Sequence, residues 1–194
     1  MKQLFATIIF ITFAGTGIRA QTAGDQPTAG TPGKAGKMTI SINGGKLSIN
    51  NTVVSTTWKL SPMVKLVNGT DRRREGYNIT HSYDELGIVL FEKTNDKTAS
   101  GEVTEVQFYI ANGDKNDVTP KQLYNGKIEL EKTVLKTNTS LETVRKILKD
   151  YKESESYTEH SYRFAKNGLY MFIQFDDEDE SIQKISVGKD TRTD

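Results

Sequence analysis

The sequence contains no cysteine among its 194 residues. This absence excludes disulfide bonds, thiolate metal sites, cysteine nucleophiles and the lipid-bearing cysteine of a bacterial lipoprotein. A strong charge of one sign is also missing, because 26 basic residues balance 25 acidic ones. A nearly neutral chain lacks the broad positive field that holds nucleic acid, so we expect no nucleic-acid partner.

Long hydrophobic runs are absent except near the N-terminus. Lys2 gives a positive start, residues 4–13 are mostly apolar, and small residues lead to Ala20. The run is too short to cross about 30 Å of hydrocarbon, and the order of these regions is typical of a secretory signal peptide. We predict a signal peptide at residues 1–20, cleavage after Ala20, a periplasmic or secreted location, and no stable membrane insertion after cleavage.

Residues 21–37 have no large apolar side chain and are rich in Gly, Pro, Thr and Ala. Such a segment cannot bury enough surface to offset the entropy of ordering. We therefore predict a disordered linker there, called the tether below.

The remaining sequence repeats itself. GKLSI at residues 45–49 recurs as GKIEL at 126–130, and GIVLF at 87–91 recurs as GLYMF at 168–172. An offset of about 81 residues preserves apolar and polar character, which predicts two copies of one unit. The predicted boundaries are a first repeat at 38–111, a linker segment at 112–125, a second repeat at 126–188 and a tail at 189–194.

A helix is predicted in each copy. Residues 139–142, TSLE, match a capping box. Apolar residues follow at helical spacing: Leu141, Val144, Ile147, Leu148 and Tyr151. The first copy has a matching helix from about Leu60 to a left-handed stop at Asn68.

Short strands precede and follow each helix. Residues 38–42 alternate before Asn43-Gly44, a dipeptide suited to a hairpin turn. Three later strands per copy are predicted at 78–83, 87–93 and 103–111, and at 160–164, 168–175 and 182–188. The predicted fold class is α+β, as two tandem helix-plus-antiparallel-sheet repeats.

Residues 87–91 and 169–173 are apolar without alternation. A strand with one solvated face should alternate, so both faces of these strands should be covered. A helix can cover one face. The other should meet the sister repeat, the linker at 112–125, or a partner.

YDELGI at residues 83–88 and YNGKI at 124–128 resemble sequences of uncharacterised exported Bacteroidota proteins, grouped as a domain of unknown function. That resemblance covers about residues 38–188 and implies no established active site. The tandem arrangement is similar to that of β-lactamase inhibitor proteins and SmpA/OmlA outer-membrane assembly lipoproteins. Without cysteine, the resemblance implies their architecture and not their activities.

Histidine occurs twice, as His81 and His160. Consecutive strand side chains point to opposite faces, so His81 and Ser82 should not form a nucleophile and base pair. The acidic run at 176–180 lacks the ligand spacing of a calcium loop. We predict no catalytic residue, cofactor or metal ion.

The copies differ at two informative places. Trp58 aligns with Thr139, and the basic run of Arg72, Arg73 and Arg74 aligns with an acidic segment. Tryptophan and arginine dominate many interfaces energetically. We predict that these four residues bind a partner protein. Alternatively, Trp58 is wedged between the repeats and the arginines form a solvated loop.

These patterns predict a non-enzymatic periplasmic or secreted protein-binding module, with an inhibitor or immunity protein as its specific form. One alternative is an envelope assembly or structural factor. Another is a hydrolase using Asp84 and Glu85 beside His81.

Overall fold

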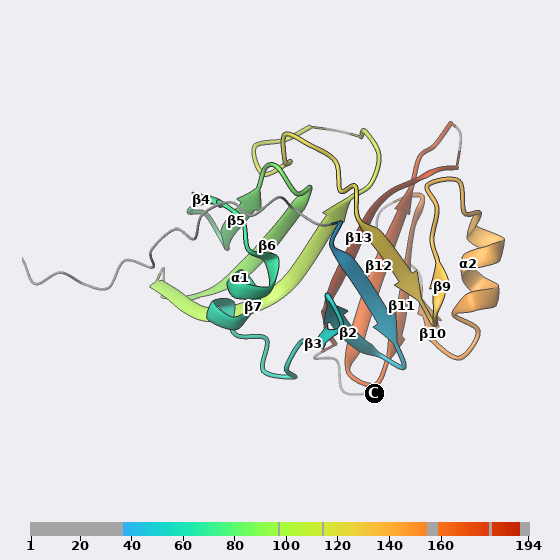
Figure 1. The fold of residues 1–194 in the computed structure, drawn as a ribbon, viewed down its shortest axis with the longest axis horizontal. Coiled ribbons are helices and arrows are strands. Elements are labelled where there is room, and N and C mark those ends of the chain that lie inside the picture. The colour runs from blue at the N-terminus through green and yellow to red at the C-terminus, as the bar shows by residue number, and fades with distance from the viewer. Residues whose placement is uncertain (1–36, 97, 114, 155–158, 179, 191–194) are drawn as a thin grey trace, which may run out of the picture.

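The structure is a computed structural model that describes residues 37–190, except 97, 114, 155–158 and 179. The predicted signal peptide, nearly all of the tether and most of the tail lie outside the described residues. Strands dominate: an eight-stranded and a five-stranded sheet are accompanied by two short helices (Figure 1). Residues 38–111 are called the first half below, and residues 126–190 the second half.

The eight-stranded sheet is continuous through both halves. At its centre β7 (Thr98–Tyr109) pairs with β13 (Ile182–Lys189). Outward from β7 lie β6 (Ile88–Asn95), β5 (Ile79–Tyr83) and the edge strand β4 (Arg72–Arg74). Outward from β13 lie β12 (Leu169–Phe175), β11 (Ser161–Lys166) and the edge strand β10 (Lys152–Ser154). All neighbours are antiparallel.

The five-stranded sheet has the order β3-β2-β1-β8-β9. Its strands are β1 (Thr39–Asn43), β2 (Lys46–Ile49), β3 (Thr52–Val53), β8 (Lys127–Leu130) and β9 (Thr133–Val134). β1 is antiparallel to β2 and parallel to β8, so it joins the two halves. Gly44 and Gly45 have φ of 58° and 73°, which suits a two-residue type I′ turn. The predicted hairpin is confirmed, with its turn one residue later than Asn43-Gly44.

Both predicted helices form. α1 (Leu60–Val67) ends at Asn68, which has the predicted left-handed conformation. α2 (Leu141–Ile147) begins after Ser140, whose side-chain oxygen accepts a hydrogen bond from the Thr143 N–H. Among the described residues, no helix is long and apolar enough to cross a membrane.

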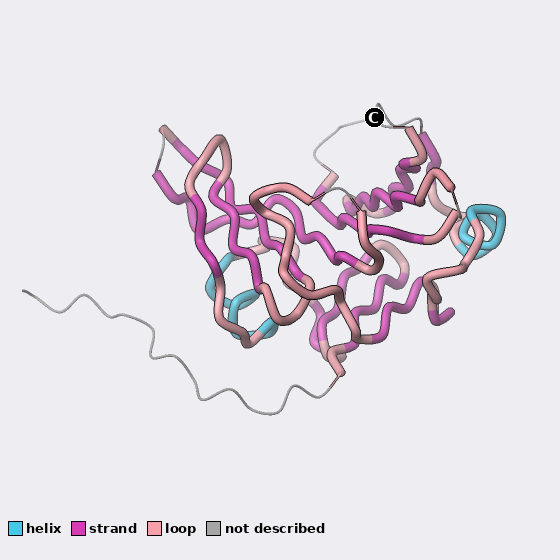
Figure 2. The backbone as a smooth tube through the Cα atoms, turned by 90° about the horizontal axis from the view of Figure 1, so that it is seen from above, coloured by secondary structure: helices cyan, strands magenta, loops and turns pink. Residues whose placement is uncertain are grey.

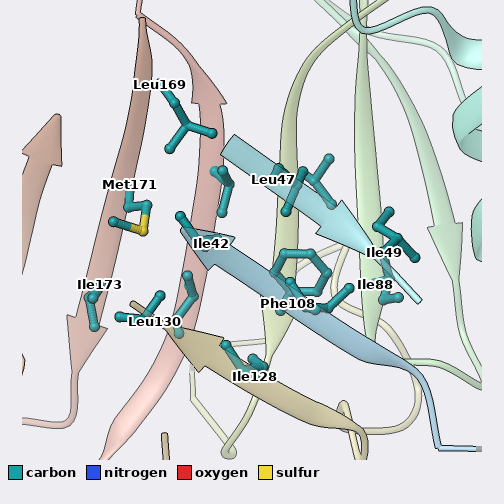
Figure 3. Close-up of a cluster of buried hydrophobic side chains, with 14 of the residues drawn as sticks. Ile42, Leu47, Ile49, Ile88, Phe108, Ile128, Leu130, Leu169, Met171 and Ile173 are labelled. Atoms are coloured by element: carbon teal, nitrogen blue, oxygen red, sulfur yellow. The ribbon is translucent and has the colours of Figure 1, made fainter. Parts of the chain in front are cut away.

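The core lies between the two sheets. Ile42 and Leu47 of the small sheet join Leu169 and Met171 of β12 in one buried apolar cluster (Figure 3). In the first half α1 contacts β7. In the second half Arg145 of α2 lies 5.3 Å from the centre of the Tyr162 ring of β11. This covered side of the large sheet is the core face, and the opposite side is the outer face.

The predicted class, α+β as two tandem helix-plus-antiparallel-sheet repeats, is wrong: the fold is largely all-β. The order of elements does recur along the two halves. However, their strands merge into one eight-stranded sheet, and β1 binds the hairpins of both halves into a second sheet. Helices of eight and seven residues cannot cover a sheet of this width. The short strands near the start of each half bury more of the core than their length suggests, as the fully buried Ile40, Ile42 and Leu130 demonstrate.

Candidate functional site

Trp58, the first residue predicted to bind a partner, lies in the core. Its side chain is 4% exposed. Its carbonyl oxygen accepts a hydrogen bond from the Val103 N–H at 2.8 Å, which ties the residue to β7. The indole therefore presents almost no surface to another protein.

Arg72 holds the linker, residues 112–125, against the outer face. Its guanidinium donates two hydrogen bonds to the Asp84 carboxylate, at 3.1 and 3.0 Å. It donates two more to the carbonyl oxygens of Asp117 and Thr119, at 2.7 and 3.2 Å. These bonds hold the pKa of Asp84 below its usual value, chiefly through the hydrogen bond from Arg72. A guanidinium that donates four hydrogen bonds to three residues fixes the position of the linker relative to the sheet.

The linker has further attachments to the sheet. The Ser82 hydroxyl on β5 donates to the Val118 carbonyl oxygen at 2.9 Å. The Tyr124 N–H donates to the Tyr109 carbonyl oxygen at 2.6 Å. Val89, on the outer face of β6, is 0% exposed. The expectation that both faces of β6 are covered is therefore met at Val89, whereas Phe91, on the same outer face, is only partly buried. Figure 2 shows the linker loop crossing the molecule.

Arg73 and Arg74 reach the surface at the sheet edge. Arg73 pairs with Glu75 at 2.6 Å, and Arg74 pairs with Asp117. Their side chains are 46% and 49% exposed, so solvent screens both ion pairs. Partner binding by these two arginines stays a prediction.

His81 is buried between two carboxylates. Its Nδ1 lies 2.7 Å from Asp71 Oδ2, and its Nε2 lies 3.1 Å from Glu92 Oε2. Glu92, itself 2% exposed, also accepts the Gly101 N–H at 2.6 Å. Both ring nitrogens can donate only when the imidazole is protonated. The cluster satisfies its own buried polar groups, and this arrangement suits a structural role.

The residues of a candidate hydrolase do not converge. His81 and Ser82 point to opposite faces, as predicted, since their partners are Asp71 and Val118 respectively. Asp84 is held by Arg72, and Glu85 is exposed. His160 precedes β11 and lies near Asp177 at 3.7 Å. No group of three potential metal ligands occurs among the described residues.

The outer face of the second half differs from that of the first. On β12 the side chains of Leu169, Met171 and Ile173 are buried in the core, whereas Tyr170 and Phe172 point outward and are only partly buried. The expectation that both faces of this strand are covered is therefore not met by the described residues.

Tyr170 is the centre of an ordered cluster on this face. Its ring meets the Phe172 ring edge-on, at a centroid distance of 5.4 Å. The Arg163 guanidinium lies 5.3 Å from the Tyr170 ring centre and pairs with Asp190 at 2.7 Å. The Tyr170 hydroxyl donates to Glu105 at 2.8 Å. Burial, with the negative charge of Glu105, raises the pKa of Tyr170, so its hydroxyl stays a donor. We call Tyr170 and Phe172 the aromatic patch; Arg163 is only 5% exposed, so it supports the patch without presenting a surface of its own.

Sequence reasoning missed this patch because the residues that hold it come from other strands: Arg163 from β11 and Glu105 from β7. The sequence did contain one indication of the patch, the unbroken apolar run at residues 169–173. A partner protein was one of the three segments or molecules expected to cover the second face of that strand.

A family model described as a domain of unknown function, DUF7738, matches residues 39–140. The chain belongs to this family. The DUF7738 match confirms the predicted membership of an uncharacterised domain family. It runs from β1 to the start of α2, and so includes the arginine strand β4 and the linker.

Other comparisons add little to the DUF7738 assignment. No curated protein matches the chain. A crystal structure of a cysteine-rich secretory protein from Staphylococcus aureus matches with 10% identity and a TM-score of 0.32. The match covers 69% of this chain and 45% of that protein, so the chain spans under half of its length. A likeness this distant carries no argument about fold or function.

Proposed function

We propose that this protein is an exported, non-enzymatic binding module that recognises another protein through the aromatic patch. One observation carries the proposal: β12 has apolar or aromatic side chains on both faces, yet no described residue fully covers Tyr170 and Phe172. Aromatic side chains are among the types that dominate binding energy at protein interfaces.

The order of the patch supports this function. Glu105 fixes the Tyr170 hydroxyl, and Asp190 fixes Arg163. Side chains that are already held lose less conformational entropy when a partner binds. The patch is therefore organised before contact.

Export is part of the proposal and is supported by the signal-peptide pattern of residues 1–20. An inhibitor or immunity protein is its specific form. We also propose that the protein comes from the Bacteroidota, and that its tandem architecture is related to that of β-lactamase inhibitor proteins or SmpA/OmlA proteins.

Affinity capture from the envelope of the native cell tests the proposal. Wild-type chain is compared with a Tyr170→Ser/Phe172→Ser variant and with a Tyr77→Ser control, because Tyr77 is 92% exposed and belongs to the first half. We expect the wild type and the control to capture the same protein, and the double variant to lose it. Equal capture by all three would reject the patch. A captured enzyme that loses activity on binding would identify an inhibitor, whereas a permanent envelope complex would identify an assembly factor.

A further inference from the structure

A pocket of about 140 Å³ lies where the linker crosses β7, β12 and β13. Gln174, Lys184 and Tyr109 face one another across these strands. They lie one row along the outer face from Phe172, which is opposite Ser186. The pocket is small compared with the sites of drug-sized ligands, so it has room for one short chemical group.

The pocket wall carries positive charge. Its lining includes Lys115, Lys121 and Lys184, and no carboxylate is among the described lining residues. Lys121 lies near the mouth, with a side chain 79% exposed and an ammonium 3.6 Å from Asp84. Lys184 belongs to a β-strand and is only partly exposed.

The Lys184 ammonium has no ionic partner among the described residues. Its contact is with the Tyr109 ring, whose centre is 5.7 Å away. Glu105, the acid that acts on it electrostatically, already accepts bonds from Gln107 and Tyr170. Burial holds the pKa of Lys184 below its usual value. An ammonium with poor solvation, whose neighbouring acid is bonded to other groups, gains more from an anion than an exposed one does.

The remaining wall is mixed: the polar side chains of Asn112, Asn116, Thr119, Gln174 and Gln183 lie beside a smaller apolar part. Ala111, Pro120 and Leu123 from the linker region line the apolar part, and Leu123 is 37% exposed. Gly113 lets the linker approach β13, because a Cβ there would lie 2.8 Å from the Gln183 side-chain oxygen. A ligand with a negative end and a short hydrocarbon body would match the positive and the apolar parts of the wall.

We infer that this pocket binds a carboxylate group on a short apolar chain, with Lys184 as its principal ion partner. The carboxylate comes from a free organic acid or from a glutamate side chain of a protein. This inference stands apart from the proposed function, because it requires no partner protein.

Titration of the full chain with sodium butyrate, followed in ¹H–¹⁵N NMR spectra, tests the inference. Butyramide has the same shape without charge, and inorganic phosphate has charge without an apolar body. We expect saturable shifts of the Tyr109, Gln183 and Lys184 amides with butyrate, and binding weaker by at least about tenfold for the other two probes. Equal binding of butyrate and butyramide would overturn the ionic role of the pocket, and equal binding of phosphate would overturn the apolar role.

Lys184→Met removes the charge and keeps the length of the side chain. We expect it to weaken butyrate binding by at least about tenfold, and Lys65→Met, on the exposed side of α1, to leave it unchanged. Lys121→Met, at the mouth, should weaken binding by about two- to threefold, and it provides the test if Lys184→Met fails to fold. Undiminished binding by a folded Lys184→Met variant, or by Lys121→Met when that variant alone folds, would refute the assignment.

N-acetylglutamic acid α-amide separates the two sources of the carboxylate. Saturable binding of this probe at the same amides indicates that a protein side chain fits. Binding of butyrate alone indicates a free acid. Failure of both probes would overturn the inference and would leave capture by the aromatic patch unaffected.

Discussion

Val89 and Tyr170 occupy matching positions on the outer faces of β6 and β12, yet their surroundings differ. Val89 is fully buried and lies opposite Ser82, to which the linker is attached, whereas Tyr170 is partly exposed. The linker follows the first half and is fastened to it by Arg72 and Ser82. Two copies of a strand can therefore have different surroundings, because a neighbouring segment decides which outer-face side chains are covered.

The core faces also differ. Leu90 of β6 is opposite His81, and the matching Met171 of β12 is opposite Phe164. The first half thus buries a histidine between two carboxylates where the second half buries a phenyl ring. Each ring nitrogen of His81 lies within hydrogen-bond distance of a carboxylate, which orients the imidazole. The two halves therefore differ in polarity on the core face as well as in burial on the outer face.

The largest expected effect concerns Trp58, whose aligned residue in the second half is Thr139. Trp58→Ala should lower the free energy of unfolding by about 3–5 kcal/mol, because it empties a buried site. Thr139→Ala should cost about 1 kcal/mol or less, since the residue lies in a partly exposed turn. Chemical denaturation measures both. Equal losses would contradict the burial of the indole.

The second largest loss of stability is expected at Arg72, which holds the linker. Arg72→Gln should cost about 2 kcal/mol, because Asp84 and two carbonyl oxygens lose their charged donor. The control is Glu153→Gln in the matching edge strand β10, where the ion pair with Arg145 is exposed. That change should stay within about 0.5 kcal/mol. A comparable loss in both variants would mean that the linker is held by other contacts.

A smaller effect tests the cover itself. Val89→Thr places a hydroxyl under the linker and should cost about 1–2 kcal/mol. Phe172→Tyr adds a hydroxyl to the open face and should change stability by less than about 0.5 kcal/mol. Thermal unfolding of the two variants compares the two faces directly. An unchanged melting temperature of the Val89→Thr variant would show that the linker does not cover this side chain.

The smallest effect depends on pH. The pKa of Asp84 is lowered in the folded protein, so its contribution is present above the unfolded value of about 4 and is lost as pH falls through the folded value. Asp84→Asn should therefore be less stable than wild type at pH 7, and the difference should shrink below about pH 4. Urea midpoints across that range measure the trend, with exposed Glu85→Gln as control. A constant difference would remove the role assigned to the Arg72 and Asp84 pair.

Local elements were predictable from the sequence because local signals specify them. The left-handed residue Asn68, the cap before α2 and the alternation in β1 each act within a few residues. The fold class was not predictable in this way. Pairing of β7 with β13, and of β1 with β8, joins segments far apart in the chain, and periodicity contains no information about which strands meet.

The same limit applies to the sites. The basic run of β4 was visible in the sequence, but the role of Arg72 as an anchor depends on carbonyl oxygens of the linker. His81 was visible too, whereas its partners Asp71 and Glu92 could be assigned only from the pairing of β5 with β6 and the path of the preceding loop.

The position of β1 has a consequence for how the protein reaches its folded state. β1 is near the start of the chain, but its parallel neighbour β8 follows the whole first half and the linker. During synthesis the edge of β1 that receives β8 stays open, and the small sheet cannot close over the core. Such long-range pairing raises the contact order and slows folding. The proposed export implies that the chain leaves the cytoplasm before it folds. Because β1 can pair with β8 only after β8 has been synthesised, the small sheet stays incomplete and the polypeptide stays unfolded enough for export until then.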